Sequence, residues 1–297
     1  EYFMPKIALS TYSFFRFIKD GRLTQFSCIQ KAADMGFDAV EFVDITPHDG
    51  SSREDYAKKL GEECARLSLP IANYTFGADL LNGSDGDLDA EVARVQKEID
   101  MAVILGAKSV RHDATLGYPQ ESRGWKGFDT VLPRLAEGVR RITEYAAEKG
   151  VRTMVENHGR FVQDSDRVEK LVNAVAHENF GLLCDMGNFM GVGENPAAAF
   201  SRVAPYAFYV HAKDNHFKSG MEADPGEGFH RTRQGDYCRG AIIGHGNAPV
   251  KQCLQILKDT GYQGNLGIEF EGLEDNELGI RIGLANLRRY VKEVWGE

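Results

Sequence analysis

Short apolar runs alternate with longer amphipathic segments along the whole chain of 297 residues. The apolar runs are rich in β-branched residues, as buried strands are, whereas the segments between them repeat apolar residues at helical spacing. Eight such pairs fill the sequence, and no linker-like or low-complexity stretch divides it. Strands that alternate with helices in this way favour a parallel sheet wrapped by helices.

The expected elements follow from these patterns and from the glycines and capping residues between them. We expect strands over residues 7–12, 39–43, 70–74, 108–112, 151–159, 180–185, 207–211 and 265–269. We expect helices over residues 23–35, 53–67, 88–105, 130–149, 165–176, 196–203, 250–260 and 276–294. An aromatic loop is expected at 14–17, and a long irregular loop at 213–246, of the kind that often covers a functional site.

Eight strand–helix units in a chain of this length favour closure into a (β/α)8 barrel, the TIM barrel, within the α/β class. A single domain over residues 1–297 is expected. An open sheet that binds a dinucleotide is disfavoured, because no Gly-x-Gly-x-x-Gly follows the first predicted strand. Residues 1–3 are interpreted as an addition ahead of a native start at Met4.

Charge and cysteine usage exclude several classes of partner. The formal net charge of -9 offers no basic field for nucleic acid or for an anionic membrane surface. The five cysteines are widely spaced and form no Cys-x-x-Cys pair, so neither a disulfide framework nor a cysteine zinc site is indicated. No apolar run approaches the roughly 18 residues of a membrane span. We therefore expect a cytoplasmic protein without nucleic-acid or membrane partners, and a homo-oligomer stays open.

Four successive predicted strands end on residues that can bind a metal ion, namely Glu156, Asp185, His211 and Glu269. In a (β/α)8 barrel these strand ends meet on the face that carries the active site. Three carboxylates gathered there repel one another unless a cation or a proton neutralises them. Oxygen donors with one imidazole suit Mn²⁺, our first expectation, or Mg²⁺, and tolerate Co²⁺ or Zn²⁺. Salt-bridged structural carboxylates are the alternative.

Other polar residues near these strand ends are candidates for contact with a substrate. His158 lies two residues beyond Glu156, so extended backbone would point both side chains the same way. His158 could be a general base or a substrate contact, and a packing role is the alternative. His112 ends an earlier strand and is a candidate substrate contact. Lys213 and Arg239 could bind a substrate oxygen or anion, with solvated charges as the alternative.

Several short motifs in the second half of the chain occur in the order typical of a known family. They are Val155-Glu156-Asn157-His158-Gly159, Cys184-Asp185-Met186-Gly187-Asn188-Phe189, Val210-His211-Ala212-Lys213-Asp214, Gly244-His245-Gly246, Gly261-Tyr262-Gln263-Gly264 and Ile268-Glu269-Phe270-Glu271-Gly272. With these motifs the sequence resembles the xylose isomerase-like superfamily, in its sugar phosphate isomerase/epimerase branch. In the first half, the resemblance rests on the strand–helix rhythm and on Met35-Gly36-Phe37-Asp38-Ala39-Val40-Glu41.

This resemblance implies a barrel that holds one divalent metal ion through Glu156, Asp185, His211 and Glu269. It also implies that Glu156 and Glu269 exchange a proton with the carbon beside a carbonyl group of a small carbohydrate, while the metal stabilises an enediolate. The expected enzyme is an isomerase or epimerase that acts on a keto sugar or polyol derivative.

Asn188 departs from part of the family, because apurinic endonucleases carry a His at this position, as do some epimerases that use it for substrate binding. DNA repair is therefore not expected, and Asn188 is kept as a candidate substrate contact. The family also includes inosose dehydratases and subunits that cleave 3-keto C-glycosides. In those subunits a His two residues past the strand-five Glu is a candidate base, so His158 keeps a lyase open as the alternative.

Overall fold

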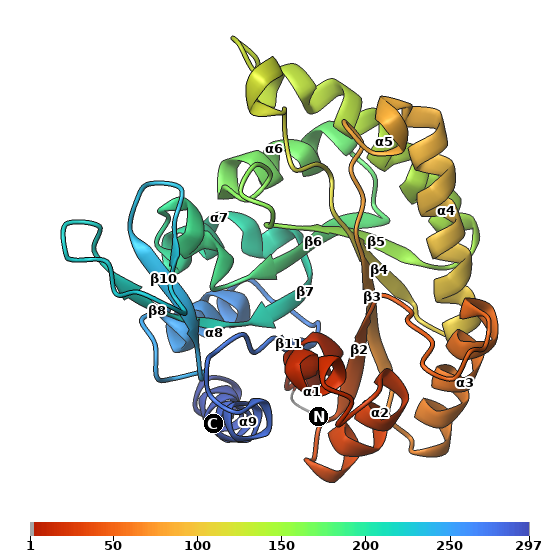
Figure 1. Cartoon of the computed structure of the whole chain (residues 1–297), viewed down its shortest axis with the longest axis vertical. Coiled ribbons are helices and arrows are strands. Elements are labelled where there is room, and N and C mark those ends of the chain that lie inside the picture. Colours follow the sequence, from red (N-terminus) through yellow and green to blue (C-terminus); the bar gives the residue numbers. More distant parts are fainter. Residues whose placement is uncertain (1–2, 297) are drawn as a thin grey trace.

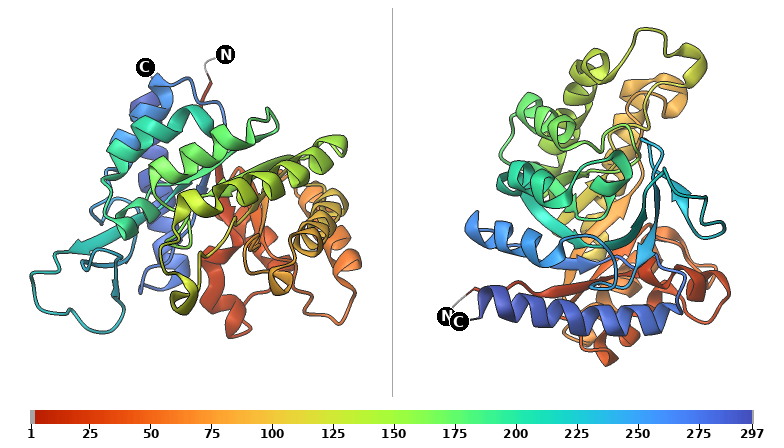
Figure 2. Two further views of the ribbon diagram at one scale, coloured as in Figure 1. Left: turned by 90° about the horizontal axis from the view of Figure 1, so that it is seen from above. Right: turned by 90° about the vertical axis from the view of Figure 1, so that its left-hand side faces the viewer.

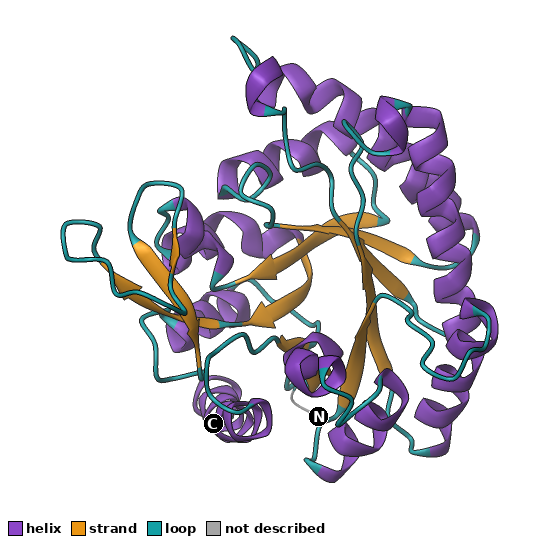
Figure 3. Ribbon diagram, in the orientation of Figure 1, coloured by secondary structure: helices purple, strands orange, loops and turns teal. Residues whose placement is uncertain are grey.

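The computed structural model describes residues 3–296 and contains a closed barrel of eight parallel strands (Figures 1 and 3). Each strand pairs with its neighbours in sequence, and the last strand closes the barrel against the first. The barrel strands are β1 (Ile7–Ser10), β2 (Ala39–Val43), β3 (Ile71–Phe76), β4 (Ser109–His112), β5 (Arg152–Glu156), β6 (Phe180–Asp185), β7 (Ala207–Ala212) and β11 (Leu266–Ile268). The predicted (β/α)8 barrel is confirmed. Of residues 1–3, interpreted as an addition, residues 1 and 2 lie outside the described part.

Helices surround the barrel, and each from the second onward packs against the next in sequence, whereas the first packs against the last (Figure 1). They are α1 (Phe15–Lys19), α2 (Gln25–Asp34), α3 (Arg53–Arg66), α4 (Leu88–Leu105), α5 (Phe128–Glu148), α6 (Ser165–Val175), α7 (Pro196–Val203), α8 (Val250–Asp259) and α9 (Asn276–Trp295). Side chains that bond first-turn N–H groups start several of these helices, as at Ser52, Asp87 and Asn195. Among residues 3–296, no helix combines the length and apolarity that crossing a membrane requires.

The barrel interior has an apolar layer with a polar layer above it. Met154, Leu183 and Tyr209 form a small buried cluster. Gly267 makes room for it, because a Cβ there would lie 2.1 Å from the Tyr209 hydroxyl oxygen. Successive residues of a strand face opposite sides, so the positions two residues further along β5, β6 and β7 point into the same interior. Those positions carry ionisable side chains, at the end of the barrel where the strands finish.

The segment 213–246 is not the irregular loop that we predicted. It contains a three-stranded antiparallel sheet of β8 (Asp214–Lys218), β10 (Tyr237–Ala241) and β9 (His230–Arg231), in the order β8-β10-β9 (Figure 1). These strands are short and rich in polar residues, so no apolar run reveals them. Gly240 bridges to Gly272, and a Cβ on Gly240 would lie 2.4 Å from the Glu271 carbonyl carbon. The small sheet therefore meets the segment after β11 backbone to backbone.

Asp214 anchors the chain where it returns from this small sheet. Its Oδ2 accepts hydrogen bonds from the N–H groups of Gly244 and Gly246, at 2.9 Å each. Its Oδ1 accepts from the N–H groups of Asn215 at 2.8 Å and Ala248 at 3.0 Å. A Cβ on Gly246 would lie 2.3 Å from this Oδ1, which explains a glycine in the Gly244-His245-Gly246 motif.

Two predicted strand ends extend too far, and the predicted aromatic loop is helical. β1 stops at Ser10, and Thr11–Phe14 forms a 3-10 helix that leads directly into α1. The Ser13 hydroxyl bonds the backbone of Ile268 and Phe270. These bonds hold the turned chain against the end of β11. β5 stops at Glu156. Figure 2 shows that α1 and the small sheet lie at one end of the barrel, and that the two ends of the described chain lie together at the other.

We predict that Glu91→Gln lowers the free energy of unfolding at pH 7 by about 1–3 kcal/mol. The buried Glu91 carboxylate accepts hydrogen bonds from Arg94, Ser84 and the Asp79 N–H. Burial disfavours its charge, but these bonds outweigh burial and lower its pKa from 4.5 to about 2. The stabilisation is therefore complete above pH 4.5 and is lost as the pH falls through about 2.

Urea unfolding of the wild-type protein and of Glu91→Gln between pH 7 and pH 2 measures this difference in stability. Glu62→Gln is the matched control, because the Glu62 side chain is 67% exposed. A deficit of Glu91→Gln that stayed constant across this range would contradict the role of the charge.

Candidate active site

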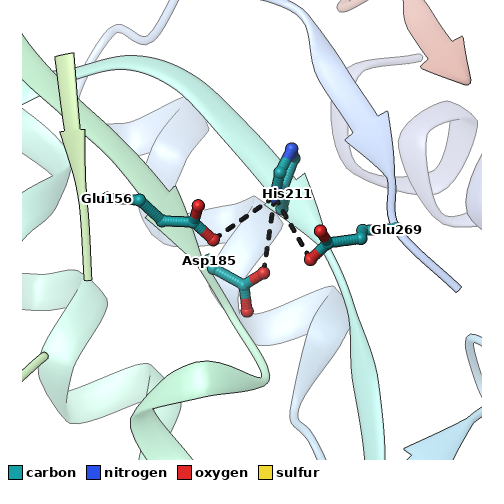
Figure 4. Close-up of side chains that lie close together, drawn as sticks. All are labelled: Glu156, Asp185, His211 and Glu269. Atoms are coloured by element: carbon teal, nitrogen blue, oxygen red, sulfur yellow. Dashed lines mark ion pairs between the residues drawn. The ribbon is translucent and has the colours of Figure 1, made fainter. Parts of the chain in front are cut away.

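Four side chains meet in the polar layer of the barrel (Figure 4). Glu156 and Asp185 are the last residues of β5 and β6, His211 lies in β7, and Glu269 directly follows β11. One donor atom from each residue lies within 4.8 Å of the other three. The first three residues are almost fully buried, and the Glu269 side chain is 13% exposed. The structure thus brings together the four predicted ligands.

Figure 4 shows the His211 imidazole facing three carboxylates. Its Nδ1 lies 3.5 Å from one oxygen of each of Glu156, Asp185 and Glu269. Ligand atoms around an ion at about 2.1 Å are separated by roughly 3.0–4.2 Å, so this spacing suits one shared ion. His211 Nδ1 and Asp185 Oδ2 are buried without a hydrogen-bond partner. A cation among the four residues would satisfy both atoms, so the donor set fits one divalent metal ion.

The charges of the cluster depend strongly on one another. Burial disfavours the His211 cation, but Glu41 and Glu269 outweigh burial and raise its pKa well above the ordinary value. Burial disfavours the Glu156 carboxylate, but Arg111 and His211 lower its pKa to about 2. Positive charge is therefore required at the centre of the cluster. A divalent ion can supply that charge in place of the imidazole proton.

Lys213 is a second cation at this site and is buried. Its ammonium lies 2.9 Å from Glu269, 2.8 Å from Glu271 and 3.8 Å from Asp185. Burial disfavours this charge, yet the carboxylates raise the pKa of Lys213 well above its usual value. Burial also raises the pKa of Asp185 to about 6. Lys213 donates to Asn188 Oδ1 at 3.2 Å, which ties the ends of β6 and β7 together.

Glu41 belongs to the site although the ligand pattern does not include it. Its carboxylate oxygens lie 3.0 and 3.2 Å from His211 Nε2, and both side chains are buried. Asn73 donates to Glu41 at 3.3 Å, and the Ser109 hydroxyl donates to Asn73 at 2.9 Å. With Nε2 bonded to Glu41, Nδ1 is left for the cluster. A lone carboxylate within the apolar β2 run was the signal that could have revealed it.

Arg111 is another site residue that the sequence patterns did not assign. Its Nε donates to Glu156 at 2.6 Å, and its Nη2 lies 3.2 Å from Asp113. Asp113 in turn lies 2.9 Å from His158 Nδ1. A buried arginine within a strand is costly unless carboxylates surround it. An arginine in a predicted strand was therefore the sequence signal that could have revealed the role of Arg111. Glu156 and His158 are thus both oriented by the end of β4.

A cavity of about 250 Å³ lies beside the cluster. The predicted His158, Asn188 and Lys213 all line it, together with Glu271. Asn188 Nδ2 donates to Glu156 Oε1 at 3.1 Å, so this side chain contacts a candidate ligand directly. His158 lies beyond the end of β5, in an isolated bridge to Val162.

His112 and Arg239 do not line this cavity. The His112 imidazole is fully buried, packs on Phe76, and places Nδ1 2.8 Å from the Asp113 carbonyl oxygen. Arg239 lies on β10, 3.6 Å from Glu274. The alternation of side chains along β4 explains the position of His112, because Arg111 faces the barrel interior and His112 faces the opposite side. Their predicted contacts with a substrate stay predictions.

The fold and the candidate metal cluster together define a class of barrel proteins with an acidic site at the strand ends. Residues 29–290 match the family described as xylose isomerase-like TIM barrel. The chain belongs to this family, as its motifs predicted.

Two relatives of assigned role illustrate the similarity in sequence. Inosose dehydratase from Clostridium beijerinckii is 28% identical over 170 residues, which are 54% of this chain and 54% of that protein. The match thus spans about half the length of that relative. The rhizopine catabolism protein MocC from Rhizobium meliloti is 29% identical over 243 residues, which are 72% of this chain and 70% of that protein.

Solved structures show the same fold at lower identity. A xylose isomerase-like TIM barrel protein from Mycobacterium smegmatis, in complex with magnesium, aligns with a TM-score of 0.71 at 18% identity over 98% of each chain. The IOLI protein with a bound zinc atom aligns with a TM-score of 0.75 at 15% identity, covering 98% of this chain and 100% of that chain. An L-ribulose 3-epimerase aligns with a TM-score of 0.69 at 16% identity, covering 98% and 96%.

We predict that Glu41→Gln weakens Mn²⁺ binding by about 10–100-fold, because the imidazole of His211 loses the carboxylate that orients it. Titration calorimetry of the metal-stripped protein measures this affinity. Glu98→Gln is a matched control: Glu98 is also a shielded carboxylate, paired with Arg53, but it lies on α4 outside the barrel. Equal Mn²⁺ affinity of Glu41→Gln and the control would rule out this role for Glu41.

Proposed function

We propose that this protein is a metal-dependent isomerase or epimerase that moves a proton beside the carbonyl group of a keto sugar or polyol derivative. The observation that carries the proposal is the pair of carboxylates, Glu156 and Glu269, that reach one point from β5 and β11. The strands β6 and β7 separate them, so the two carboxylates approach from different sides. Two such bases allow a proton to leave one face of a carbon and another to arrive on the opposite face.

A divalent ion at the cluster would polarise the carbonyl and adjacent hydroxyl oxygens of the substrate. Glu156 and Glu269 exchange the proton, and each is held as a carboxylate by a neighbouring cation, Arg111 or Lys213. Lys213 and Asn188 line the 250 Å³ cavity and can bind substrate hydroxyl groups. Their bonds to the two glutamates also fix how those carboxylates face the substrate.

Mn²⁺ is our proposed ion, in agreement with a donor set of three carboxylates and one imidazole. The magnesium and zinc in two structural relatives support a divalent ion at this site in general. A cytoplasmic location is proposed as well, and the five free, buried cysteines are compatible with a reducing compartment.

A lyase that uses the same site is the second candidate, and the pair of His158 and Asp113 favours it. His158 Nδ1 is bonded to Asp113 at 2.9 Å, and the imidazole lines the 250 Å³ cavity. In such an elimination, a base removes the proton beside the carbonyl, and a hydroxyl or aglycone leaves the next carbon with a proton from an acid. The similarity to inosose dehydratases supports this candidate.

We predict that Glu156→Gln and Glu269→Gln each lower turnover by at least about 10²-fold, because each removes one proton-transfer group. The measurement is incorporation of solvent deuterium into ketohexoses and inososes by NMR, in D₂O with Mn²⁺. Glu98→Gln serves as the control for loss of a carboxylate elsewhere. Near-normal exchange in either site variant, with metal bound, would contradict its assignment.

His158→Asn separates the two candidate reactions. An isomerase retains measurable turnover in this variant and yields isomers of unchanged mass apart from solvent deuterium. A lyase loses at least about 10²-fold of its turnover in this variant, and its wild-type form releases water or an aglycone from the substrate. Mass spectrometry and NMR of the products decide between them. The companion variant Asp113→Asn leaves the imidazole in place and tests whether its orientation matters.

A further inference from the structure

A second, larger cavity of about 470 Å³ opens between the ends of β1 and β2. Most of its surface is apolar and comes from side chains such as Tyr12, Phe15, Ile18, Leu23, Val43 and Pro47, and polar residues that include Lys19, Asp44 and His48 also line it. It lies at the same end of the barrel as the metal cluster, because Tyr12 follows β1 and Val43 is the last residue of β2. The proposed proton transfer makes no use of it.

One wall of this cavity is fastened to the backbone around Glu269. The buried Ser13 hydroxyl donates to the Ile268 carbonyl at 3.0 Å and accepts from the Phe270 N–H at 3.0 Å. These two residues flank Glu269 directly. Arg16 extends the attachment by donating to the Gly272 carbonyl at 2.9 Å. The cavity wall and a proposed catalytic carboxylate are therefore parts of one rigid unit.

Tyr12 forms part of the wall of the 470 Å³ cavity. Its ring stacks on Phe15 with centroids 5.6 Å apart and an interplanar angle of 22°, which gives the large cavity a flat aromatic wall. Tyr12 precedes Ser13, which bonds both residues that flank Glu269, and Glu269 lies 2.9 Å from Lys213 in the wall of the 250 Å³ cavity. Both cavities therefore adjoin the segment around Glu269.

Gln25 bonds several backbone polar groups of the other wall. Gln25 donates from Nε2 to the carbonyl oxygens of Val43 at 2.9 Å and Asp44 at 2.8 Å. Its Oε1 accepts from the Thr46 N–H at 2.8 Å. Sugar hydroxyls need hydrogen-bond partners when they leave water, and the backbone groups that Gln25 bonds are less available to them. Apolar atoms gain from burial there, and an aromatic ring gains further from offset stacking.

We propose that the 470 Å³ cavity is a second substrate subsite that takes an apolar, ring-shaped substituent attached to the sugar. The proposal rests on the proposed function, with the sugar bound at the polar 250 Å³ cavity beside the metal cluster. A substrate with one polar and one apolar half matches the two adjoining spaces. It narrows the substrate class from free sugars to glycoside-like molecules with an aromatic or similar apolar group.

The test compares phenyl β-D-glucopyranoside with methyl β-D-glucopyranoside as probes for the Mn²⁺-loaded protein by titration calorimetry. Burial of the ring should make the phenyl compound bind at least about tenfold more tightly. Ile18→Trp fills the cavity and should abolish this preference. Ile104→Trp is the matched control, since Ile104 is 42% exposed on α4 and lies outside the cavity. Leu23→Trp replaces Ile18→Trp if the latter does not fold by circular dichroism.

Equal affinity for the two probes, a preference that survives filling of the cavity, or no binding of the phenyl compound would overturn the proposal. So would a monomer–dimer equilibrium that Ile18→Trp shifts in sedimentation, because a second copy would then cover the cavity. Glu156→Gln separates this result from the proposed function. Turnover is lost in that variant, whereas the preference for the phenyl probe should remain.

Discussion

Electrostatic repulsion among buried carboxylates governs the polar end of this barrel. Glu156, Asp185 and Glu269 converge on one imidazole nitrogen in a place that water barely reaches. Each carboxylate would be strongly destabilised there without positive charge nearby. Arg111 and Lys213 supply part of that charge from the flanks, and both are themselves buried. The buried carboxylates and cations stabilise one another, so the chemistry of the site and the packing at this end of the barrel depend on the same contacts.

The positions of the ligands follow from the parity of the strands. A strand that presents Met154 or Leu183 to the barrel interior must present the residue two places later to the same interior. The apolar layer thus fixes the direction of Glu156 and Asp185 before any ion is considered. The fold could be predicted for the same reason: long apolar periodicities dominate, and α4 and α7 have the predicted bounds.

What the sequence did not reveal depends on contacts between distant segments. Glu41 looks like an isolated acid in an apolar run, and its role appears only when β2 is placed across the barrel from His211. The role of Ser13 likewise appears only when β1 is paired with β11, because its hydroxyl bonds the backbone at the end of β11. The small sheet after β7 escaped prediction because its strands are short and contain no sustained apolar run, although much of β10 is buried. For His112, position at a strand end led to a predicted substrate contact that stays a prediction, and the side chain does not line the 250 Å³ cavity.

Asp214 separates the part of the chain that must stay fixed from the part that can change. Its four bonds to backbone N–H groups close a loop that begins just after His211 and returns at Ala248. Between these points the segment also contacts the rest of the chain, through the bridge of Gly240 to Gly272 and the bond from the Arg233 N–H to the Gly191 carbonyl. The turns between these contacts could therefore change in length without moving the imidazole, whereas Lys213 at the start of the segment is tied to Glu269. Relatives that share the metal cluster would then diverge most in the excursion between β7 and α8.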